Sequence, residues 1–466
     1  MPVMTELTTA ERKTRGKAAR SVAPIESHAD IGPDAGRDPV GLVIGQAATR
    51  VPDLVPIRHG RMLASPFTFY RGAALPMAAD LSTVPSSGIR VQLCGDAHLS
   101  NFGVFGAPDR RLVFDLNDFD ETLPGPFEWD VKRFAASLAV AGRDVGLSAK
   151  DRKTLVMAGV AAYRTGMTEF TQMKMLEVWY ARLDVEEGLE RLAPKVGEEA
   201  LGRTRKAMAK ARTRDSMQVL KKLTSVVDGQ RRIMSNPPLV VPIEELAHPH
   251  RAEEIMARMG TLLTQYRRTL SADRRHLVEQ FRLVGVARKV VGVGSVGTRA
   301  WILLLEADGG AEPLFLQAKE AQRSVLADYC GASRYRNEGQ RVVAGQHLMQ
   351  AASDIFLGWQ HVEDGLDGGS RDFYVRQLRD WKYSAVIEQM ILPGLIAYAE
   401  LCGWTLARAH ARSGDRFAIA GYLGKSDKFD RALAKFAEAY ADRNEADHAA
   451  LSAAVVDGRI EAVTGI

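Results

Sequence analysis

Two short polar segments hold the side chains whose types and spacing point most directly to chemistry. Residues 95–101 read Gly-Asp-Ala-His-Leu-Ser-Asn, and residues 117–121 read Asn-Asp-Phe-Asp-Glu. Each segment follows a stretch with the apolar character of a strand, at residues 89–93 and 111–114. Because side chains at the ends of neighbouring strands can converge, we expect the two segments to form one site.

Three side chains of these segments match the requirements of phosphoryl transfer. Asp96 would accept the proton of an attacking hydroxyl or orient it, while Asn101 and Asp118 would hold Mg²⁺ ions that bridge nucleotide phosphates. Mg²⁺ prefers oxygen ligands, which carboxylate and amide groups supply. Asp120 is a further candidate metal ligand. A lone Asp more often caps a turn, but polar groups at matching places after two predicted strands favour a catalytic site.

His98 raises an alternative reaction. A Gly-Asp-x-His stretch also occurs in two-metal phosphoesterases, which need several more histidines and an Asn-His-Asp element to hold their metals. The chain has ten histidines, and none of them lies in such an element. We therefore assign His98 to positioning the catalytic segment.

A glycine-rich segment at residues 292–297, Gly-Val-Gly-Ser-Val-Gly, fits the pattern G-x-G-x-x-G. In a dinucleotide-binding fold such a loop opens a helix. Here strand-like residues lie on both sides, at 286–293 and 300–305, and no Gly-Lys-Ser/Thr ending follows. Strand, glycine loop and strand is the layout of the kinase loop that covers the nucleotide phosphates. The residues predicted to contact those phosphates are Gly292, Gly294, Ser295 and Gly297.

Lys319 follows the next predicted strand, at residues 314–318. A lysine at this place would contact the nucleotide phosphates and be held by a glutamate of the next helix, predicted at residues 337–349. Glu338 is the candidate glutamate. Glu320 competes for this role, but neighbouring residues of a strand point to opposite faces.

These motifs together resemble a known superfamily. Residues 95–101 resemble the catalytic loop of aminoglycoside phosphotransferases and choline kinases, and residues 117–120 resemble their metal-binding segment, with Asp118 at the matching position. Asp130 resembles the buried Asp that opens their following helix and braces the catalytic loop. Those enzymes carry a His directly before Gly-Asp, whereas this chain has Cys94 there.

From about residue 61 to residue 424 the chain also resembles the bacterial family known as domain of unknown function 2252. The stretches that carry this resemblance are residues 65–72, 289–297, 339–343 and 406–411. The resemblance implies a kinase-like nucleotide-binding protein, and it implies nothing about the acceptor.

The order of the motifs is reversed, because the catalytic segment precedes the glycine loop. The resemblance therefore implies an α+β, two-lobed kinase-like fold that is circularly permuted and carries a large helical segment. The helix predicted at residues 392–410 would then pack beside residues 89–93 without being joined to them. Residues 373–378 would form the hinge strand that takes the adenine, with Trp381 and Lys382 just past it.

The predicted organisation has five parts. Residues 150–280 have almost entirely helical patterns, and a Pro-rich connector at residues 236–242 interrupts them. The parts are a disordered tail at 1–38, the catalytic and metal segments at 39–150, a helical segment at 151–280, a nucleotide-binding sheet at 281–384 and C-terminal helices at 385–466.

Composition excludes several other classes of protein. The chain has 466 residues, a net charge of +5 and three cysteines far apart in the sequence. Sparse, unpaired cysteines argue against a disulfide framework. The absence of a long apolar run predicts a soluble, cytoplasmic protein without a membrane partner. The basic stretch 203–232 is most simply a solvated helix face, so nucleic acid is not an expected partner, and the oligomeric state leaves no sequence signal.

The sequence therefore predicts an ATP- and Mg²⁺-dependent phosphotransferase that acts on a small-molecule hydroxyl. Two alternatives remain open. The same residues would serve nucleotidyl transfer onto a protein, and the fold would also suit a nucleotide-binding module without turnover. The acceptor pocket would come from helices after the metal segment, where no motif identifies its ligand.

Overall fold

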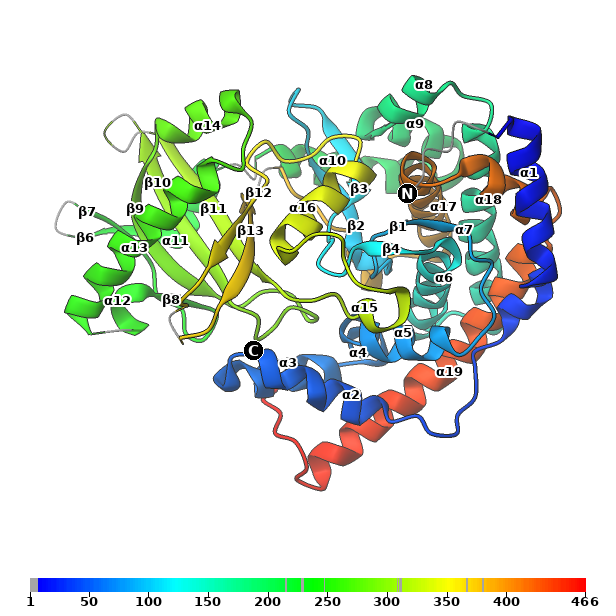
Figure 1. Ribbon diagram of the computed structural model, residues 1–466, viewed down its shortest axis with the longest axis horizontal. Coiled ribbons are helices and arrows are strands. Elements are labelled where there is room, and N and C mark those ends of the chain that lie inside the picture. Colours follow the sequence, from blue (N-terminus) through cyan, green and yellow to red (C-terminus); the bar gives the residue numbers. More distant parts are fainter. Residues whose placement is uncertain are drawn as a thin grey trace.

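A computed structural model describes residues 7–213, 216–227, 230–246, 248–307, 309, 312–365, 368–378 and 381–466. It has two halves, one built around a large sheet and the other around a group of long helices, with α16 between them (Figure 1). None of the described helices is long and apolar enough to cross a membrane. The described chain is a mixture of helices and antiparallel sheets, which agrees with the predicted α+β class.

The sheet half is organised around an antiparallel sheet of six strands in the described residues, in the order β12-β13-β11-β10-β9-β8. Its strands are β8 (Val240–Pro242), β9 (Arg282–Lys289), β10 (Ala300–Ala307), β11 (Glu312–Ala321), β12 (Gly358–Val362) and β13 (Arg371–Gln377). The helices of this half are α11 (Ser216–Leu223), α12 (Ile243–Leu246), α13 (Pro249–Arg267) and α14 (Ala272–Glu279), while α15 (Ala327–Cys330) and α16 (Glu338–Met349) lie between the two halves. A hairpin of β6 (Thr224–Val227) and β7 (Gln230–Ile233) lies beside them.

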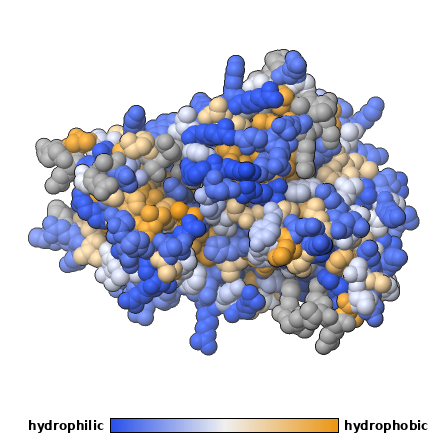
Figure 2. Space-filling view, turned by 90° about the horizontal axis from the view of Figure 1, so that it is seen from above, coloured by the Kyte–Doolittle hydropathy of each residue, from blue (hydrophilic) through white to orange (hydrophobic). Residues whose placement is uncertain are grey.

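Both faces of this sheet are apolar where helices cover it, which explains the continuous apolar run of β10. Leu303 packs in the core under α13, and its neighbour Leu304 packs in a separate core with α11. Alternate residues of a strand point to opposite faces, so a strand buried on both sides loses its polar alternation. Figure 2 shows hydrophobic side chains gathered on the half that holds this sheet, with hydrophilic ones over most of the same face.

The helical half contains the largest core. Its main helices are α6 (Phe127–Asp144), α7 (Ala149–Phe170), α8 (Met175–Tyr180), α9 (Val185–Val196), α10 (Glu198–Arg212), α17 (Leu392–Ser413), α18 (Arg416–Leu423) and α19 (Lys428–Val456). Its strands are β1 (Arg90–Leu93), β2 (Phe102–Gly106), β3 (Leu112–Leu116), β4 (Leu123–Pro126) and β5 (Leu183–Asp184). The backbones of α7 and α17 lie so close together that a Cβ on Gly403 would be 2.2 Å from the Gly159 carbonyl oxygen.

Most predicted strands and helices are present, with three differences in the middle of the chain. Residues 150–280 are mainly helical, but β5 to β8 interrupt them. The Pro-rich connector ends in β8, which joins the large sheet because Val240 and Pro242 pair with β9. The basic stretch 203–232 includes the β6-β7 hairpin as well as helices, and its residues 214–215 and 228–229 lie outside the described residues.

The expectation of a disordered tail at residues 1–38 is wrong for its described part. Residues 7–38 include α1 (Thr9–Ala18) and lead to α2 (Pro39–Gly45), α3 (Val55–Leu63), α4 (Pro66–Gly72) and α5 (Ala74–Ser82). Thr8 caps α1, and Arg12 and Arg15 both pair with the buried Asp415 of the neighbouring α18. The tail docks through these ion pairs, through a close backbone approach and through a few buried side chains such as Ile25 and His28, and composition reveals none of these contacts.

Substituting Gly16 tests this docking. Alanine normally stabilises a helix by about 1 kcal/mol relative to glycine. However, a Cβ at Gly16 would lie 1.9 Å from the Ala418 carbonyl oxygen. We therefore expect Gly16→Ala to lower stability by about 2 kcal/mol, in the range of an overpacked core, as measured by chemical unfolding.

Gly45 is a matched control because nothing lies within 4 Å of the Cβ that alanine would add there. Gly45→Ala should leave stability unchanged or raise it slightly. If Gly16→Ala is as stable as Gly45→Ala, the helix α1 is not docked against α18.

Candidate functional site

A pocket between the two halves brings most of the predicted site residues together. This central pocket has a volume of about 130 Å³. The segments that line it come from the N-terminal helices, the two polar segments, the glycine loop and the end of β11 with the residues after it. Its lining includes Gln46, Arg50, Arg58, Arg71, Asp96, His98, Asn101, Asp118, Asp120, Glu121, residues 292–295, Glu320 and Arg323.

The segment that carries Asp96 is held by a buried carboxylate. Asp130, in the first turn of α6, accepts hydrogen bonds from the backbone nitrogens of Cys94 at 2.8 Å and Gly95 at 3.1 Å. Gly95 has φ +87°, and a Cβ there would lie 2.4 Å from the Glu121 carbonyl oxygen. Glycine is therefore required at this turn. Asp130 braces the segment as the resemblance implied.

The helix α17, which lies late in the chain, supports the same segment on the side of Asp130. His410 Nε2 lies 3.2 Å from Asp130 Oδ2, and its Nδ1 lies 2.8 Å from the Tyr163 hydroxyl. Tyr398 lies nearer the N-terminus of the same helix and contacts the other end of the segment. Its hydroxyl donates to the carbonyl oxygens of Leu99 at 2.8 Å and Phe102 at 3.1 Å. The predicted helix 392–410 thus packs against the catalytic segment.

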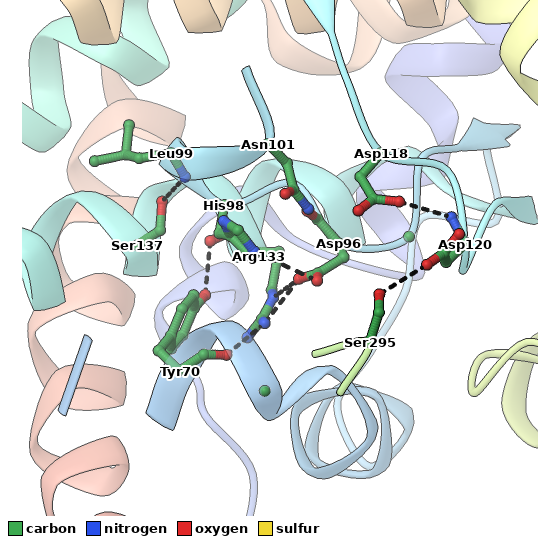
Figure 3. A network of polar contacts seen from close by, with 12 residues as sticks. Tyr70, Asp96, His98, Leu99, Asn101, Asp118, Asp120, Arg133, Ser137 and Ser295 are labelled. Carbon is green, nitrogen blue, oxygen red and sulfur yellow. Dashed lines mark hydrogen bonds and ion pairs between the residues drawn. The ribbon is translucent and has the colours of Figure 1, made fainter. Parts of the chain in front are cut away.

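Asp96 lies at the centre of a network of polar contacts (Figure 3). Arg133 of α6 donates to Asp96 Oδ1 at 2.8 Å, and the same guanidinium donates to the Tyr70 carbonyl oxygen at 2.6 Å. Burial raises the pKa of Asp96 to about 6, although the charge of Arg133 acts in the opposite direction. Asp96 is therefore ionised near neutral pH and accepts a proton more readily than an ordinary carboxylate does.

His98 is buried beside Asp96, as expected of a positioning residue. Its Nε2 lies 3.5 Å from Asp96 Oδ2, and its carbonyl oxygen accepts from the Asn101 backbone nitrogen at 2.9 Å. Burial holds the pKa of His98 well below its usual range, and the charges of Arg71 and Arg133 act in the same direction. A neutral imidazole shapes the turn without adding a charge to the pocket.

Asn101 joins the two polar segments. Its side-chain nitrogen donates to the Asp96 carbonyl oxygen at 2.9 Å, which leaves its amide oxygen for another partner. Its carbonyl oxygen accepts from the Asn117 nitrogen at 2.8 Å. The two segments do not follow neighbouring strands as we expected, because β1 pairs with β4 and β3 pairs with β2. This backbone contact brings them together instead.

Asp120 is the point where the two halves meet. Its Oδ2 accepts from Lys319 Nζ at 2.8 Å and from the Ser295 hydroxyl at 3.0 Å, and its Oδ1 accepts from the Tyr374 hydroxyl at 2.6 Å. Burial disfavours the carboxylate, but the charge and hydrogen bond of Lys319, together with the hydrogen bond of Tyr374, lower the pKa of Asp120 to about 2. Both carboxylate oxygens of Asp120 already have hydrogen-bond partners. The structure therefore gives Asp120 the role of joining these segments, and a metal would have to compete with those partners for its oxygens.

Asp118 is the more available carboxylate. Its side chain is 32% exposed, and its Oδ1 lies 3.8 Å from Lys319 Nζ. In Figure 3 it faces the space between Asn101 and Asp120. The described residues contain no cluster of three or more His, Cys, Asp and Glu side chains suited to a metal. The amide oxygen of Asn101 and the carboxylate of Asp118 are nevertheless the hard oxygen donors that Mg²⁺ takes from a protein when phosphates and water complete its shell.

The glycine loop lies between two antiparallel strands, β9 and β10, and does not open a helix. The strand predicted at residues 286–293 lies four residues earlier in the structure, because β9 spans Arg282–Lys289 and the loop begins after it. Gly297 has φ +87°, which favours glycine. The N-terminal helices hold the loop, since Arg61 donates to the Gly292 carbonyl oxygen at 2.9 Å and Arg50 donates to that of Val296.

Lys319 and Glu338 are not partners. The ammonium of Lys319 pairs with Asp120 and is buried over the ring of Tyr374. Glu338, in the first turn of α16, pairs with Arg341. Arg341 competes with Lys319 for the Glu338 carboxylate, because Arg341 is fully buried and needs a counter-charge. Arg341 also donates to the carbonyl oxygens of Asp120 and Thr122 at 2.9 and 2.7 Å. Glu338 therefore supports the metal segment through Arg341.

Glu320 faces away from Lys319, as its neighbouring place on β11 predicts. Its carboxylate accepts from the Arg299 backbone nitrogen at 3.0 Å and pairs with the Arg299 guanidinium at 3.2 Å. This contact fastens the end of the glycine loop to the strand that carries Lys319.

A second pocket of about 260 Å³ lies beyond the metal segment. Its walls include Asn117, the end of β13 at Arg376 and Gln377, and Lys382. Arg376 donates to the Asn117 carbonyl oxygen at 3.3 Å, so the two pockets share residues 117–120 as a common wall. The predicted hinge lines this pocket, although residues 379–380 lie outside the described residues.

Several functional contacts have no signal in the sequence. Arg133 and Tyr374 hold Asp96 and Asp120, yet each looks like an ordinary residue of a helix or strand. Arg50, Arg58 and Arg71 line the pocket from the N-terminal helices. The one signal available was that Arg71 lies in the stretch 65–72, which carried the family resemblance.

Comparison with known proteins identifies the family. The family model described as "Uncharacterized protein conserved in bacteria (DUF2252)" matches residues 50–454. The chain belongs to this family. No curated protein and no solved structure matches the chain. The matched region includes every residue of the central pocket except Gln46.

The roles of the two neighbouring carboxylates can be separated by stability. Asp120→Ala would leave buried Lys319 with only the more distant Asp118, and loss of one partner of a buried ion pair costs about 3 kcal/mol or more. Asp118→Ala removes a partly exposed group, for which we expect a loss of about 1 kcal/mol at most. Urea unfolding of both variants measures the difference. Equal losses would mean that Asp120 does not fasten the two halves.

Proposed function

We propose that this protein is an ATP- and Mg²⁺-dependent phosphotransferase with a hydroxyl acceptor. The observation that carries the proposal is the position of Lys319. Its ammonium lies 2.8 Å from Asp120 and 3.8 Å from Asp118, and Asp120 also binds Ser295 of the glycine loop. A lysine, a glycine loop and metal-type carboxylates that lie this close can contact one phosphate chain.

The arrangement of the sheet supports a kinase-like site. The glycine loop joins the first two strands of the run β9-β10-β11, Lys319 lies on the third, and α16 follows. Protein kinases place their glycine-rich loop and their lysine in the same relation. The departure is that Glu338 does not hold the lysine. In this proposal the adenine lies in the second pocket, against residues 376–378.

A permuted two-lobed fold explains how a catalytic segment that comes early in the chain can serve this sheet. The helix α17, which would precede the catalytic segment in an unpermuted kinase, supports it through His410 and Tyr398. Contacts that normally join consecutive segments are here made across the fold. We therefore propose that the family has a circularly permuted kinase-like architecture.

In this reaction Asp96 is the base. It accepts the proton of the acceptor hydroxyl, while Arg133 holds its carboxylate in place. Asn101 and Asp118 would hold Mg²⁺, which neutralises phosphate charge when bound. Lys319 and the backbone of residues 292–297 contact the phosphates. Catalysis then depends on positioning and on charge neutralisation.

The direct test is turnover of ATP in the presence of Mg²⁺ and a pool of small hydroxyl metabolites. Asp118→Ala should lower turnover by at least about a hundredfold, since it removes a ligand of the metal. Mass spectrometry of the products separates phosphoryl transfer from nucleotidyl transfer by the mass that is gained. Full turnover in Asp118→Ala, or the absence of Mg²⁺-dependent ATP binding in the wild type, would contradict the proposal.

The raised pKa of Asp96 predicts the pH dependence. The base acts only when ionised, so turnover should fall as the pH drops below about 6, the pKa that burial gives this group. Asp96→Asn should lower turnover by about a hundredfold or more at every pH and remove this acid limb. Nucleotide affinity should change far less. An acid limb that persists in Asp96→Asn would assign it to another group.

A further inference from the structure

Three arginines of the central pocket have no assigned contact with a substrate in the proposed reaction. Arg50 precedes α3, Arg58 lies within α3, and Arg71 lies in the last turn of α4. All three belong to the N-terminal helical segment and not to the sheet or the long helices. They therefore form a separate wall of the pocket.

Three of the carboxylates around these arginines already have cationic partners, and the partly buried Glu121 accepts from the Val325 backbone nitrogen at 2.7 Å. Asp96 pairs with Arg133 at 2.8 Å, Asp120 pairs with Lys319 at 2.8 Å, and Glu320 pairs with Arg299 at 3.2 Å. Those side chains satisfy one another. They leave no carboxylate within ion-pair distance of the three arginines among the described residues.

The three arginines bind only neutral groups or none. Arg58 is 1% exposed and donates to the Gln46 side-chain oxygen at 2.8 Å and to the carbonyl oxygens of Val43 and Gly72 at 3.3 and 3.2 Å. Arg50 donates to a carbonyl oxygen of the glycine loop. The Nε atoms of all three are buried without a hydrogen-bond partner in the described part of the chain.

Burying guanidinium groups without an anion is unfavourable, and a bound anion would remove that cost. The planar fork of arginine suits the paired oxygens of a phosphate or a carboxylate. Burial lowers the pKa of Arg58, and it lowers the pKa of Arg71 although the charges of Asp96 and Glu388 act in the opposite direction. The wall is thus suited to an anionic ligand.

The position of Arg71 indicates whether the anionic group belongs to the nucleotide or to the acceptor. Its helix is fixed against the base, because the Tyr70 hydroxyl donates to the Arg133 carbonyl oxygen at 2.6 Å and Arg133 holds Asp96. In Figure 3 Asp96 lies between Tyr70 on one side and Asp118 and Asp120 on the other. Lys319 and the metal ligands belong to the nucleotide side. The guanidinium of Arg71 lies close enough to Asp96 and His98 for its charge to act on the pKa of both groups, so it lies beside the base, where the acceptor must approach.

We propose that Arg50, Arg58 and Arg71 bind an anionic group of the acceptor, so that the acceptor is a hydroxyl compound that carries a phosphate or a carboxylate. This inference rests on the proposed function, because it takes Asp96 as the base and the side of Lys319 as the nucleotide side. The inference names the class of acceptor for that site, whereas no sequence motif in residues 150–280 identifies the acceptor.

Binding of inorganic phosphate to the full-length protein tests the inference by isothermal titration calorimetry. We expect phosphate to bind in the presence of saturating ADP and Mg²⁺ as well as without them. Arg71→Gln should weaken phosphate binding at least tenfold and leave ADP binding unchanged. The control is Arg323→Gln, a second pocket arginine whose guanidinium already pairs with Asp328 at 2.6 Å, and it should bind phosphate like the wild type. Titration with acetate distinguishes a carboxylate site from a phosphate site.

Arg71→Lys provides a variant that keeps the charge but loses the fork, and it should bind phosphate more weakly than the wild type if Arg71→Gln does not fold. The inference is overturned if the wild type binds neither phosphate nor acetate, if Arg323→Gln weakens binding as much as Arg71→Gln, or if phosphate competes with ADP. Failure of the proposed function has a different outcome, namely that ADP and Mg²⁺ bind to Asp118→Ala as they do to the wild type.

Discussion

The buried contact between Lys319 and Asp120 is the interaction on which the arrangement of the site depends. The two residues are 199 positions apart in the chain and come from different halves of the molecule. Asp120 also accepts from Tyr374 of β13 and from Ser295 of the glycine loop, so one carboxylate fixes two strands and a loop relative to residues 117–121. Because Lys319 is buried, its charge cannot be left without a partner, and the halves are held in one relation.

A second layer of contacts keeps the polar segments in place around this ion pair. Asp130 and His410 hold the backbone before Asp96, and Arg341 holds the backbone from Asp120 to Thr122. These supporting groups touch main-chain atoms or each other and do not line the pocket. They give the pocket residues fixed positions, which is what transfer of a group between two bound molecules requires.

The sequence predicted the side chains that face the pocket better than the side chains that hold them. Asp96, Asn101 and Asp118 follow apolar stretches, and a polar residue at the end of a strand is visible from local pattern alone. The partners of these residues are not visible in this way, because Tyr374 reaches Asp120 across 254 positions. Pairing Lys319 with Glu338 failed for the same reason, since the sequence does not show that Arg341 competes for the glutamate. The N-terminal segment was misjudged because its contacts are ionic and its apolar content is low.

The link between Asp130 and His410 spans 280 positions and has a consequence for synthesis of the protein. The catalytic segment leaves the ribosome early, together with the Asp that braces it. The helix that supports both is made only when most of the chain has been translated. Until α17 appears, residues 95–101 lack the hydroxyl of Tyr398 and the ring of His410, so the nascent chain carries the catalytic segment without its support. A chain of this topology therefore completes the support of residues 95–101 only near the end of translation.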